Sequence, residues 1–229
     1  YVPWVWHNSG IFIQNDGTIQ PADAPIQRRG NEYTFKSDIF AGISIQRSNA
    51  LIDGNGHKLL GSYYGTGLFL QNVSNVIIQN VNVQYFEQGI YFDNSNNSIL
   101  KSTTTERCGV DTFQSSNNQI TGNKIGGDIS VDFSSNNTIA QNNASSVSIS
   151  WSANITIENN RIADAKRSDA QLTSANYTEG IYVDNSVNCL IVNNKVERKN
   201  VGIDIWQNLN LTLSRNILID NQVGFKIWG

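Results

Sequence analysis

The stretch Ser115-Ser116-Asn117-Asn118-Gln119-Ile120-Thr121-Gly122-Asn123-Lys124-Ile125 decides the fold, because its pattern returns along the chain as SSNNTIAQNN (134–143), SANITIENNRI (152–162) and SVNCLIVNNKV (186–196). Eight asparagines align with an aliphatic residue three positions after each: Asn49, Asn75, Asn96, Asn117, Asn136, Asn154, Asn188 and Asn210. Six of them have a second asparagine six positions later: Asn55, Asn123, Asn142, Asn160, Asn194 and Asn216. The anchors recur about every 21 residues with one much longer interval, and such a period is the signature of a repeat protein.

A second block precedes the anchors and consists of short segments that begin with glycine. It is clearest in GIYFD (89–93), GIYVD (180–184), GIDIW (202–206) and GFKIW (224–228). Apolar residues alternate with polar or aromatic residues in each, which is typical of a strand with one buried face. Asparagine, which makes up 32 of the 229 residues, favours the left-handed backbone of tight corners.

Together these blocks predict an all-β, right-handed parallel β-helix, a β-solenoid of about eight to nine coils of roughly 21 residues. Ile and Val side chains would fill its interior, and asparagines at identical corners would bond to one another in ladders. A leucine-rich horseshoe has a similar period but requires a dense leucine pattern that is absent here. We expect residues 1–40 to form an extended capping segment and 41–229 the solenoid, with a polar loop inserted at 163–179 that projects from the stack.

Charge and hydropathy narrow the possible partners and locations. The net charge of −3 and the pI of about 5.3 argue against a nucleic-acid partner, and every apolar run is too short to span a membrane. The chain begins at Tyr1 without a leader, so we expect a processed protein in an extracellular or cell-surface location. Seven Asn-x-Ser/Thr sequons agree with secretion, and three that lie off the anchor column are the glycosylation candidates: Asn72, Asn143 and Asn176.

The repeat units resemble those of the pectin-lyase-like superfamily, and within it the NosD-like surface proteins. The segments that carry the resemblance are SNNSIL (95–100) and the three repeats quoted above, together with an entry segment that ends in ALIDGNGHKLLG (50–61). The resemblance implies the parallel β-helix but not one function, because this fold carries lyases, hydrolases, epimerases, adhesins and inert surface proteins.

The NosD resemblance also implies copper, and the composition argues against it. Copper sites of soft character use methionine, cysteine and clustered histidine, whereas this chain has no methionine, two cysteines and only His7 and His57. Calcium could bind aspartate and carbonyl oxygens, but no dense aspartate loop is present. We therefore expect no metal site and no cofactor.

Members of the superfamily that cleave polysaccharides use carboxylates on the outer face of one sheet, so that face holds the candidates. If the protein is an enzyme, the catalytic candidates are Asp93, Asp111, Asp132, Asp184 and Asp204. The candidates for carbohydrate contact are Tyr91, Tyr182, Trp206 and Trp228. The Asn-Thr-Asp, His-Gly and Arg-x-Lys segments of polygalacturonase-like hydrolases and the Asp-Pro-His of alginate epimerases are absent. Aspartate after a strand is also a common turn former, and an outer face must carry polar residues.

Two functions therefore remain open. The first is a secreted, non-catalytic solenoid that associates with itself head to tail in an extracellular filament or surface layer. Its contacts would come from apolar residues at the two ends: Tyr1, Val2, Trp4, Trp6, Phe225, Ile227 and Trp228. The second is a carbohydrate-active enzyme or carbohydrate-binding module. In either case, the repeat places Cys108 and Cys189 about four coils apart, so we expect two buried free thiols.

Overall fold

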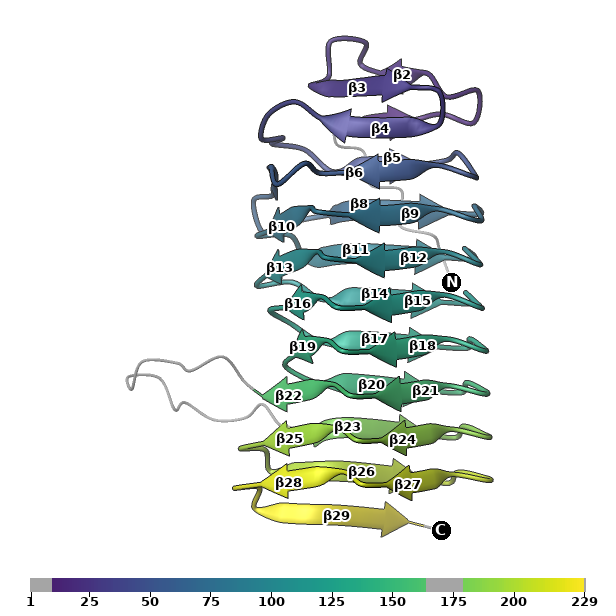
Figure 1. The fold of residues 1–229 in the computed structure, drawn as a ribbon, viewed down its shortest axis with the longest axis vertical. Helices are drawn as coiled ribbons and strands as arrows, with labels where there is room; N and C mark the ends of the chain where they lie inside the picture. Colours follow the sequence, from purple (N-terminus) through teal and green to yellow (C-terminus); the bar gives the residue numbers. More distant parts are fainter. Residues whose placement is uncertain (1–9, 164–178, 229) are drawn as a thin grey trace.

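The computed structural model describes residues 10–163 and 179–228, which form a parallel β-solenoid (Figure 1). Each complete coil contributes one strand to each of three sheets that run the length of the stack. Within these ranges the chain has no helix, and so none that could cross a membrane. The prediction of an all-β solenoid with a period of one coil per repeat is confirmed.

The strands of the three sheets are as follows. Sheet 1 has eleven strands: β1 (Ile11–Ile13), β2 (Ile19–Gln20), β5 (Ile43–Ile45), β8 (Thr66–Gln71), β11 (Gln88–Asp93), β14 (Val110–Phe113), β17 (Ile129–Asp132), β20 (Val147–Ser150), β23 (Glu179–Asp184), β26 (Val201–Trp206) and β29 (Val223–Trp228). Sheet 2 has ten strands: β3 (Ile26–Arg29), β4 (Glu32–Phe35), β6 (Leu51–Asp53), β9 (Ile77–Gln79), β12 (Ile99–Lys101), β15 (Gln119–Thr121), β18 (Thr138–Ala140), β21 (Thr156–Glu158), β24 (Leu190–Val192) and β27 (Thr212–Ser214). Sheet 3 has eight strands: β7 (Lys58–Leu60), β10 (Asn82–Gln84), β13 (Thr104–Glu106), β16 (Lys124–Ile125), β19 (Asn143–Ala144), β22 (Arg161–Ala163), β25 (Lys195–Glu197) and β28 (Ile217–Ile219).

The interior is a continuous column of apolar side chains. Alternate residues of each strand point inward, so Ile90 and Phe92 are fully buried while Tyr91 between them is only partly covered. The same holds for Ile181 and Val183 on β23. The apolar columns predicted for the glycine-led strands are therefore confirmed as the core.

Asparagine ladders fix the corners. The exposed anchors adopt the left-handed backbone, as at Asn154 (φ 56°). Several donate to the anchor before them: Asn154 Nδ2 lies 2.9 Å from Asn136 Oδ1, and Asn75, Asn188 and Asn210 make the same bond. A second ladder is buried: Asn142 Oδ1 accepts from the amide of Asn123 at 3.0 Å, and Asn142 Nδ2 donates to Asn160 Oδ1 at 3.1 Å. Ladders of this kind satisfy corner amides that no sheet covers.

The alignment made from the sequence was wrong at one anchor, Asn96, and at one residue of the second asparagine column, Asn55. Asn97, with φ 54°, takes the anchor place given to Asn96, because Leu100, not Ile99, pairs with buried Ile78. The pair of adjacent asparagines and the pair of adjacent aliphatic residues made both alignments equally good by pattern alone. Asn55 lies outside the buried ladder, in an exposed turn where its amide bonds to Asp53 Oδ1 at 2.8 Å.

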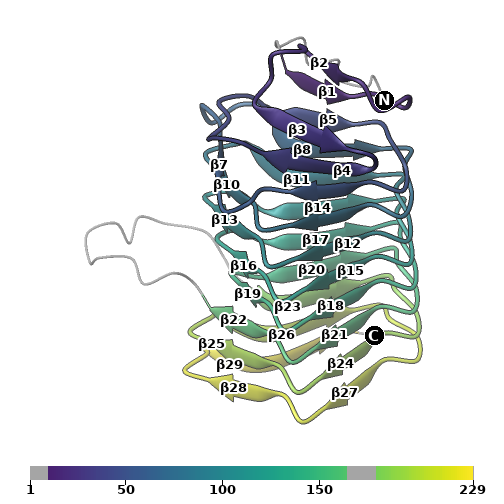
Figure 2. The same ribbon diagram turned by 45° about the horizontal axis from the view of Figure 1, so that its top comes forward.

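The first strands join the stack in a different way from the rest. β1 pairs parallel to β5, and β2 closes the edge of sheet 1 by pairing antiparallel to β1. β3 likewise pairs antiparallel to β4, whose other edge is parallel to β6. Figure 2 shows β1 to β4 at one end of the stack. The division into a capping segment (1–40) and a solenoid (41–229) stays a prediction.

Several predictions concern the insertion and the two ends. The insertion joins β22 to β23, and most of it, with the glycosylation candidate Asn176, lies outside the described residues. The four association candidates Tyr1, Val2, Trp4 and Trp6 also lie outside them. On β29, Phe225 and Ile227 continue the columns of buried Ile203 and Ile205 but are 48% and 66% exposed. Self-association through them stays a prediction.

The two cysteines are placed as the repeat predicts. Cys108 and Cys189 are both free and buried. Burial raises the pKa of each thiol, because the thiolate would lose its hydration there. The expectation of two unpaired, buried thiols is confirmed.

Candidate functional site

The outer face of sheet 1 carries two columns of side chains in register, as the sequence predicted. The first column crosses the middle of the strands and contains Tyr91, Asp111, Ser130, Ser148, Tyr182, Asp204 and Lys226. The next outward column contains Asp93, Phe113, Asp132, Ser150, Asp184, Trp206 and Trp228. All five catalytic candidates and all four carbohydrate-contact candidates thus lie on one face, but they fall into two groups.

The first group surrounds Asp111 on β14. Burial, together with repulsion from Asp132 and Asp128, raises the pKa of Asp111 to about 6. Burial also raises the pKa of Asp132, although its hydrogen bonds to Ser130, 2.9 Å away, and to Ser150 oppose the shift. Two neighbouring carboxyls that do not both ionise easily are typical of acid–base sites, and also of crowded polar surfaces.

The remaining members of this group frame the carboxyls. Asp93 lies in the same column as Asp132, but Phe113 separates them. Tyr91, one coil before Asp111, stacks on Phe69 with ring centroids 5.6 Å apart and an interplanar angle of 20°. The face is therefore acidic at its centre and aromatic at its borders.

Two aromatic residues that the sequence analysis missed lie beside these carboxyls. Phe133 and Trp151 directly follow β17 and β20, and they are 55% and 57% exposed. Their rings are almost parallel, at 5° with centroids 6.3 Å apart, and Phe113 meets Phe133 edge to face at 5.7 Å. Together, Phe113, Phe133 and Trp151 form an aromatic row across three successive coils.

The backbone of this row is unfavourable for aromatic residues. Phe133 and Trp151 have φ of 50° and 51°, in the left-handed region that large side chains rarely adopt. Other coils place Asn94 or Asn185 at the same corner, and asparagine tolerates that backbone. The sequence contained a signal for these two residues. A buried serine follows this corner in five coils: Ser95, Ser115, Ser134, Ser152 and Ser186. The residue before it is asparagine or glutamine in three of these coils and aromatic in two adjacent ones.

The second group lies on the last two coils. Asp204 is 3% exposed, with Oδ2 3.9 Å from Lys226 Nζ, and its Oδ1 has no hydrogen-bond partner among the described residues. Lys226 Nζ also lies 4.7 Å from the ring centroid of Trp228, which stacks on Trp206 at 4.7 Å. Asp204 is therefore engaged in an ion pair with Lys226 on the outer face of sheet 1.

The second group also contains Tyr182 and the carboxyl of Asp184. Burial raises the pKa of Tyr182, and the charges of Asp184 and Asp204 raise it as well. Asp184 Oδ1 accepts a hydrogen bond of 2.8 Å from Asn185. The structure does not bring Asp184 and Asp204 together with Asp93, Asp111 and Asp132, so a single five-carboxylate centre is not formed.

Two of the three glycosylation candidates are described. Asn72 has a left-handed backbone, and its Oδ1 accepts from Asn94 Nδ2 at 2.6 Å. Asn143 lies exposed on β19, where its side chain makes no hydrogen bond with a described residue. Modification of either stays a prediction.

Comparison with known proteins gives a family and a fold. The family model described as "Periplasmic copper-binding protein (NosD)" matches residues 48–229. No curated protein matches the sequence. Among solved structures, an alginate lyase from Paenibacillus sp. str. FPU-7 is similar, with a TM-score of 0.51 and 15% identity over 84% of this chain and 89% of that one.

Two further structures are more distant. The catalytic domain of a GH87 α-1,3-glucanase in complex with nigerose gives a TM-score of 0.37 and 12% identity, over 86% of this chain and 62% of that one. The Streptococcus pneumoniae surface protein and adhesin PfbA gives 0.30 and 11%, over 96% and 84%. At these identities the likeness extends to the fold alone.

The described residues do not fit the copper that the family description names. Copper sites are built from clustered imidazole, thiolate and thioether groups. Cys108 and Cys189 are buried on separate coils, and His57 lies 3.6 Å from Asp38 without a further ligand. Across residues 10–163 and 179–228, no group of three or more His, Cys, Asp or Glu side chains could hold a metal ion.

Proposed function

The chain belongs to the NosD family, and from that premise we propose that it is a periplasmic or extracellular solenoid whose outer face on sheet 1 binds a polysaccharide. The observation that carries the proposal is the row of Phe113, Phe133 and Trp151, in which Phe133 and Trp151 are exposed and Phe113 is partly buried. Sugar rings present flat, weakly polar C–H faces that stack on aromatic side chains, which combine a large contact area with few torsions to order.

The unfavourable backbone conformation of Phe133 and Trp151 supports a binding role. A left-handed backbone at a large residue costs on the order of 1–2 kcal/mol, and such strain concentrates at functional sites. A corner used only for packing would favour asparagine, as at Asn185. Phe133 and Trp151 also expose more than half of their surface, so they contribute little to the core.

Polar groups beside the row would recognise sugar hydroxyls. Asp132 and Ser130 lie on β17, which ends directly before Phe133, and Ser150 lies directly before Trp151. Carboxylates and hydroxyls next to an aromatic platform can accept and donate hydrogen bonds to a sugar held on it. The sheet continues in both directions, so a polymer could extend along the stack.

The proposal is tested by binding measurements on the full chain. Affinity electrophoresis and calorimetry with laminarin and alginate would measure binding to a neutral and an acidic polysaccharide. Trp151→Asn keeps a residue suited to the left-handed corner, and we expect it to weaken laminarin binding at least about tenfold. Phe40→Ser is the matched control, because Phe40 is 78% exposed and precedes β5, four strands away from β17 in sheet 1.

Unchanged affinity in the Trp151→Asn variant, or equal loss in the Phe40→Ser variant, would contradict the proposal. Absence of binding to both polymers would also count against it.

The raised pKa of Asp111 favours cleavage of a glycosidic bond as a second candidate function. A carboxyl with a pKa of about 6 is partly protonated near neutral pH and can donate to a leaving oxygen, while the neighbouring Asp132, once ionised, would activate water. Release of reducing ends from either polymer, abolished by Asp111→Asn and by Asp132→Asn, would support this. Turnover that survives both substitutions would exclude this pair.

A further inference from the structure

A shallow groove lies on another part of the molecule, at the corner between sheets 2 and 3. Its volume is about 490 Å³, and it crosses the four coils that contain β13, β16, β19 and β22. At one strand spacing per coil, the groove is on the order of 14 Å long. It is lined mainly by Ser102, Thr104, Gly122, Gln141, Asn143 and Asn159, with Lys124 and Arg161.

The groove exists because of what the corners carry. Ser102, Gln141 and Asn159 all have a left-handed backbone at this corner. Gly122 has φ 66° at the same position and presents no side chain, and a Cβ placed there would meet no atom within 4 Å. The hollow is therefore open above Gly122.

The charge of the groove is positive. Lys124, Asn143 and Arg161 are consecutive members of one outward column of sheet 3, so the two cations are separated by two coil spacings. None of the residues that line the groove is acidic. The Lys124 ammonium has no partner among the described residues.

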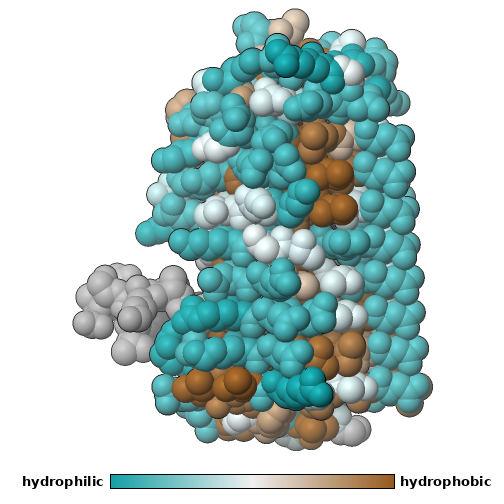
Figure 3. Space-filling model, viewed as in Figure 1, coloured by the Kyte–Doolittle hydropathy of each residue, from teal (hydrophilic) through white to brown (hydrophobic). Residues whose placement is uncertain are grey.

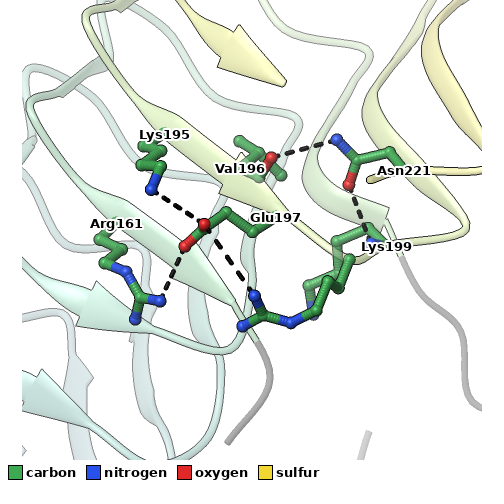
Figure 4. Close-up of polar contacts among 7 residues, drawn as sticks. Arg161, Lys195, Val196, Glu197, Lys199 and Asn221 are labelled. Atoms are coloured by element: carbon green, nitrogen blue, oxygen red, sulfur yellow. Dashed lines mark hydrogen bonds and ion pairs between the residues drawn. The ribbon is translucent and has the colours of Figure 1, made fainter. Parts of the chain in front are cut away.

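A buried carboxylate holds the basic side of the groove in place. Glu197 is 7% exposed, with Oε2 2.7 Å from Arg161 Nη2, Oε1 2.9 Å from Lys195 Nζ and 3.9 Å from Arg198 Nη1 (Figure 4). One carboxylate cannot neutralise three cations, so net positive charge remains at the surface. Arg161 has five N–H donors and uses one edge here, which leaves others for a ligand.

We infer that this groove binds the carboxylate groups of an acidic polysaccharide, on a face separate from the aromatic row. Arginine recognises carboxylates through two parallel hydrogen bonds, and the surrounding amides and hydroxyls match sugar hydroxyls. No aromatic side chain lines the groove, so it lacks the stacking platform with which proteins hold single-stranded nucleic acid. The face drawn in Figure 3 is mainly hydrophilic over sheet 3 away from its last strand, β28, and hydrophobic residues gather there and over the early strands of sheet 2.

The test uses polygalacturonate as the probe, with its fully methyl-esterified form and polyuridylate as comparison polymers. We expect the full chain to bind polygalacturonate in a salt-dependent manner, and Lys124→Gln to weaken this about tenfold. Asn143→Asp, which adds a negative charge between the two cations, should weaken it further. Lys36→Gln, an exposed lysine next to β4, is the control for net charge. Unfolding curves would establish that all variants are folded.

Several outcomes would overturn the inference. They are equal binding of the esterified polymer, tighter binding of polyuridylate, equal loss in Lys36→Gln, or no effect of Lys124→Gln. A glycan on Asn143 in the natural protein would also overturn it, because the glycan would fill the groove. The Trp151→Asn variant separates the two faces: it should retain polygalacturonate binding in the groove, and its failure to bind laminarin would concern the aromatic row alone.

Discussion

Replacing Asp111 with asparagine should stabilise the protein, and only above about pH 4. The folded-state pKa of Asp111 is about 6, against an ordinary value of 3.8, because burial and the charges of Asp132 and Asp128 disfavour its ionised form. A folded state that holds a proton more tightly than the unfolded chain loses stability as the pH rises between these two values. The difference corresponds to at most about 3 kcal/mol.

The expected curve has a definite shape. Below the ordinary pKa, both folded and unfolded Asp111 are protonated, so wild type and Asp111→Asn should have nearly equal free energies of unfolding. The gap should open between about pH 4 and pH 6 and then stay constant, with the variant more stable by up to about 3 kcal/mol at pH 8. The groups that face Asp111 are Tyr91 on β11, Asp128 and Asp132 on the following coil, and the thiol of Cys108.

Urea unfolding at pH 4, 5, 6, 7 and 8 measures this difference, and titrations of carboxyls elsewhere cancel when the two curves are subtracted. Asp23→Asn, at an exposed position, controls for the loss of one negative charge. If the Asp111→Asn curve ran parallel to that of the wild type, the assignment of the raised pKa to Asp111 would be refuted. A variant less stable than wild type at pH 8 would show that its carboxylate makes a favourable contact.

Three other outcomes are expected. Asn142→Ala removes a buried amide that bonds to Asn123, Asn160 and the carbonyl of Ile120, so unfolding curves should show a loss of about 3–5 kcal/mol, against less than about 1 kcal/mol for Asn154→Gly in the exposed ladder; equal losses would contradict the role of the buried ladder. Trp151→Asn should leave the free energy of unfolding within about 1 kcal/mol of the wild type, because relief of backbone strain offsets the lost ring stacking, and a larger loss would mean that the ring serves packing. Both thiols should resist a chromogenic disulfide reagent until urea unfolds the chain, since burial raises their pKa, and rapid labelling of the folded protein would contradict their placement.

The sequence was sufficient for the fold because each coil repeats the same local choices. Alternating apolar residues, as at Ile90 and Phe92, identify the inward side of a strand without knowledge of its neighbours. The outward columns then follow from counting, which is why Asp111 and Asp132 could be assigned to adjacent strands. Counting failed at Asn96 and Asn97, where two registers satisfied the pattern and only the pairing of Leu100 with Ile78 distinguishes them.

The candidate sites were less predictable because they depend on departures from the repeat. Phe133 and Trp151 occupy a corner that the pattern treats as irrelevant to the core. The groove depends on a missing side chain at Gly122 and on Glu197, whose partner Arg161 lies on the preceding coil across the insertion. Neither the size of a hollow nor the clamping of one side chain by another follows from a period of about 21 residues.

The solenoid separates the residues that stabilise it from those that can serve a function. Inward side chains and buried asparagines form the core and the ladders, so the outward positions of sheet 1 can vary without loss of the fold. Three adjacent coils nonetheless carry features that lower stability: a carboxyl resisting ionisation at Asp111, a second at Asp132, and aromatic residues in left-handed corners at Phe133 and Trp151. Tyr63 and Tyr85 also have a left-handed backbone, so backbone strain alone does not distinguish these coils. Raised carboxyl pKa values and exposed aromatic rings coincide only around β14, β17 and β20 among the described strands, and for this reason we propose this part of sheet 1, and not the ion-paired group at Asp204, as the ligand-binding place.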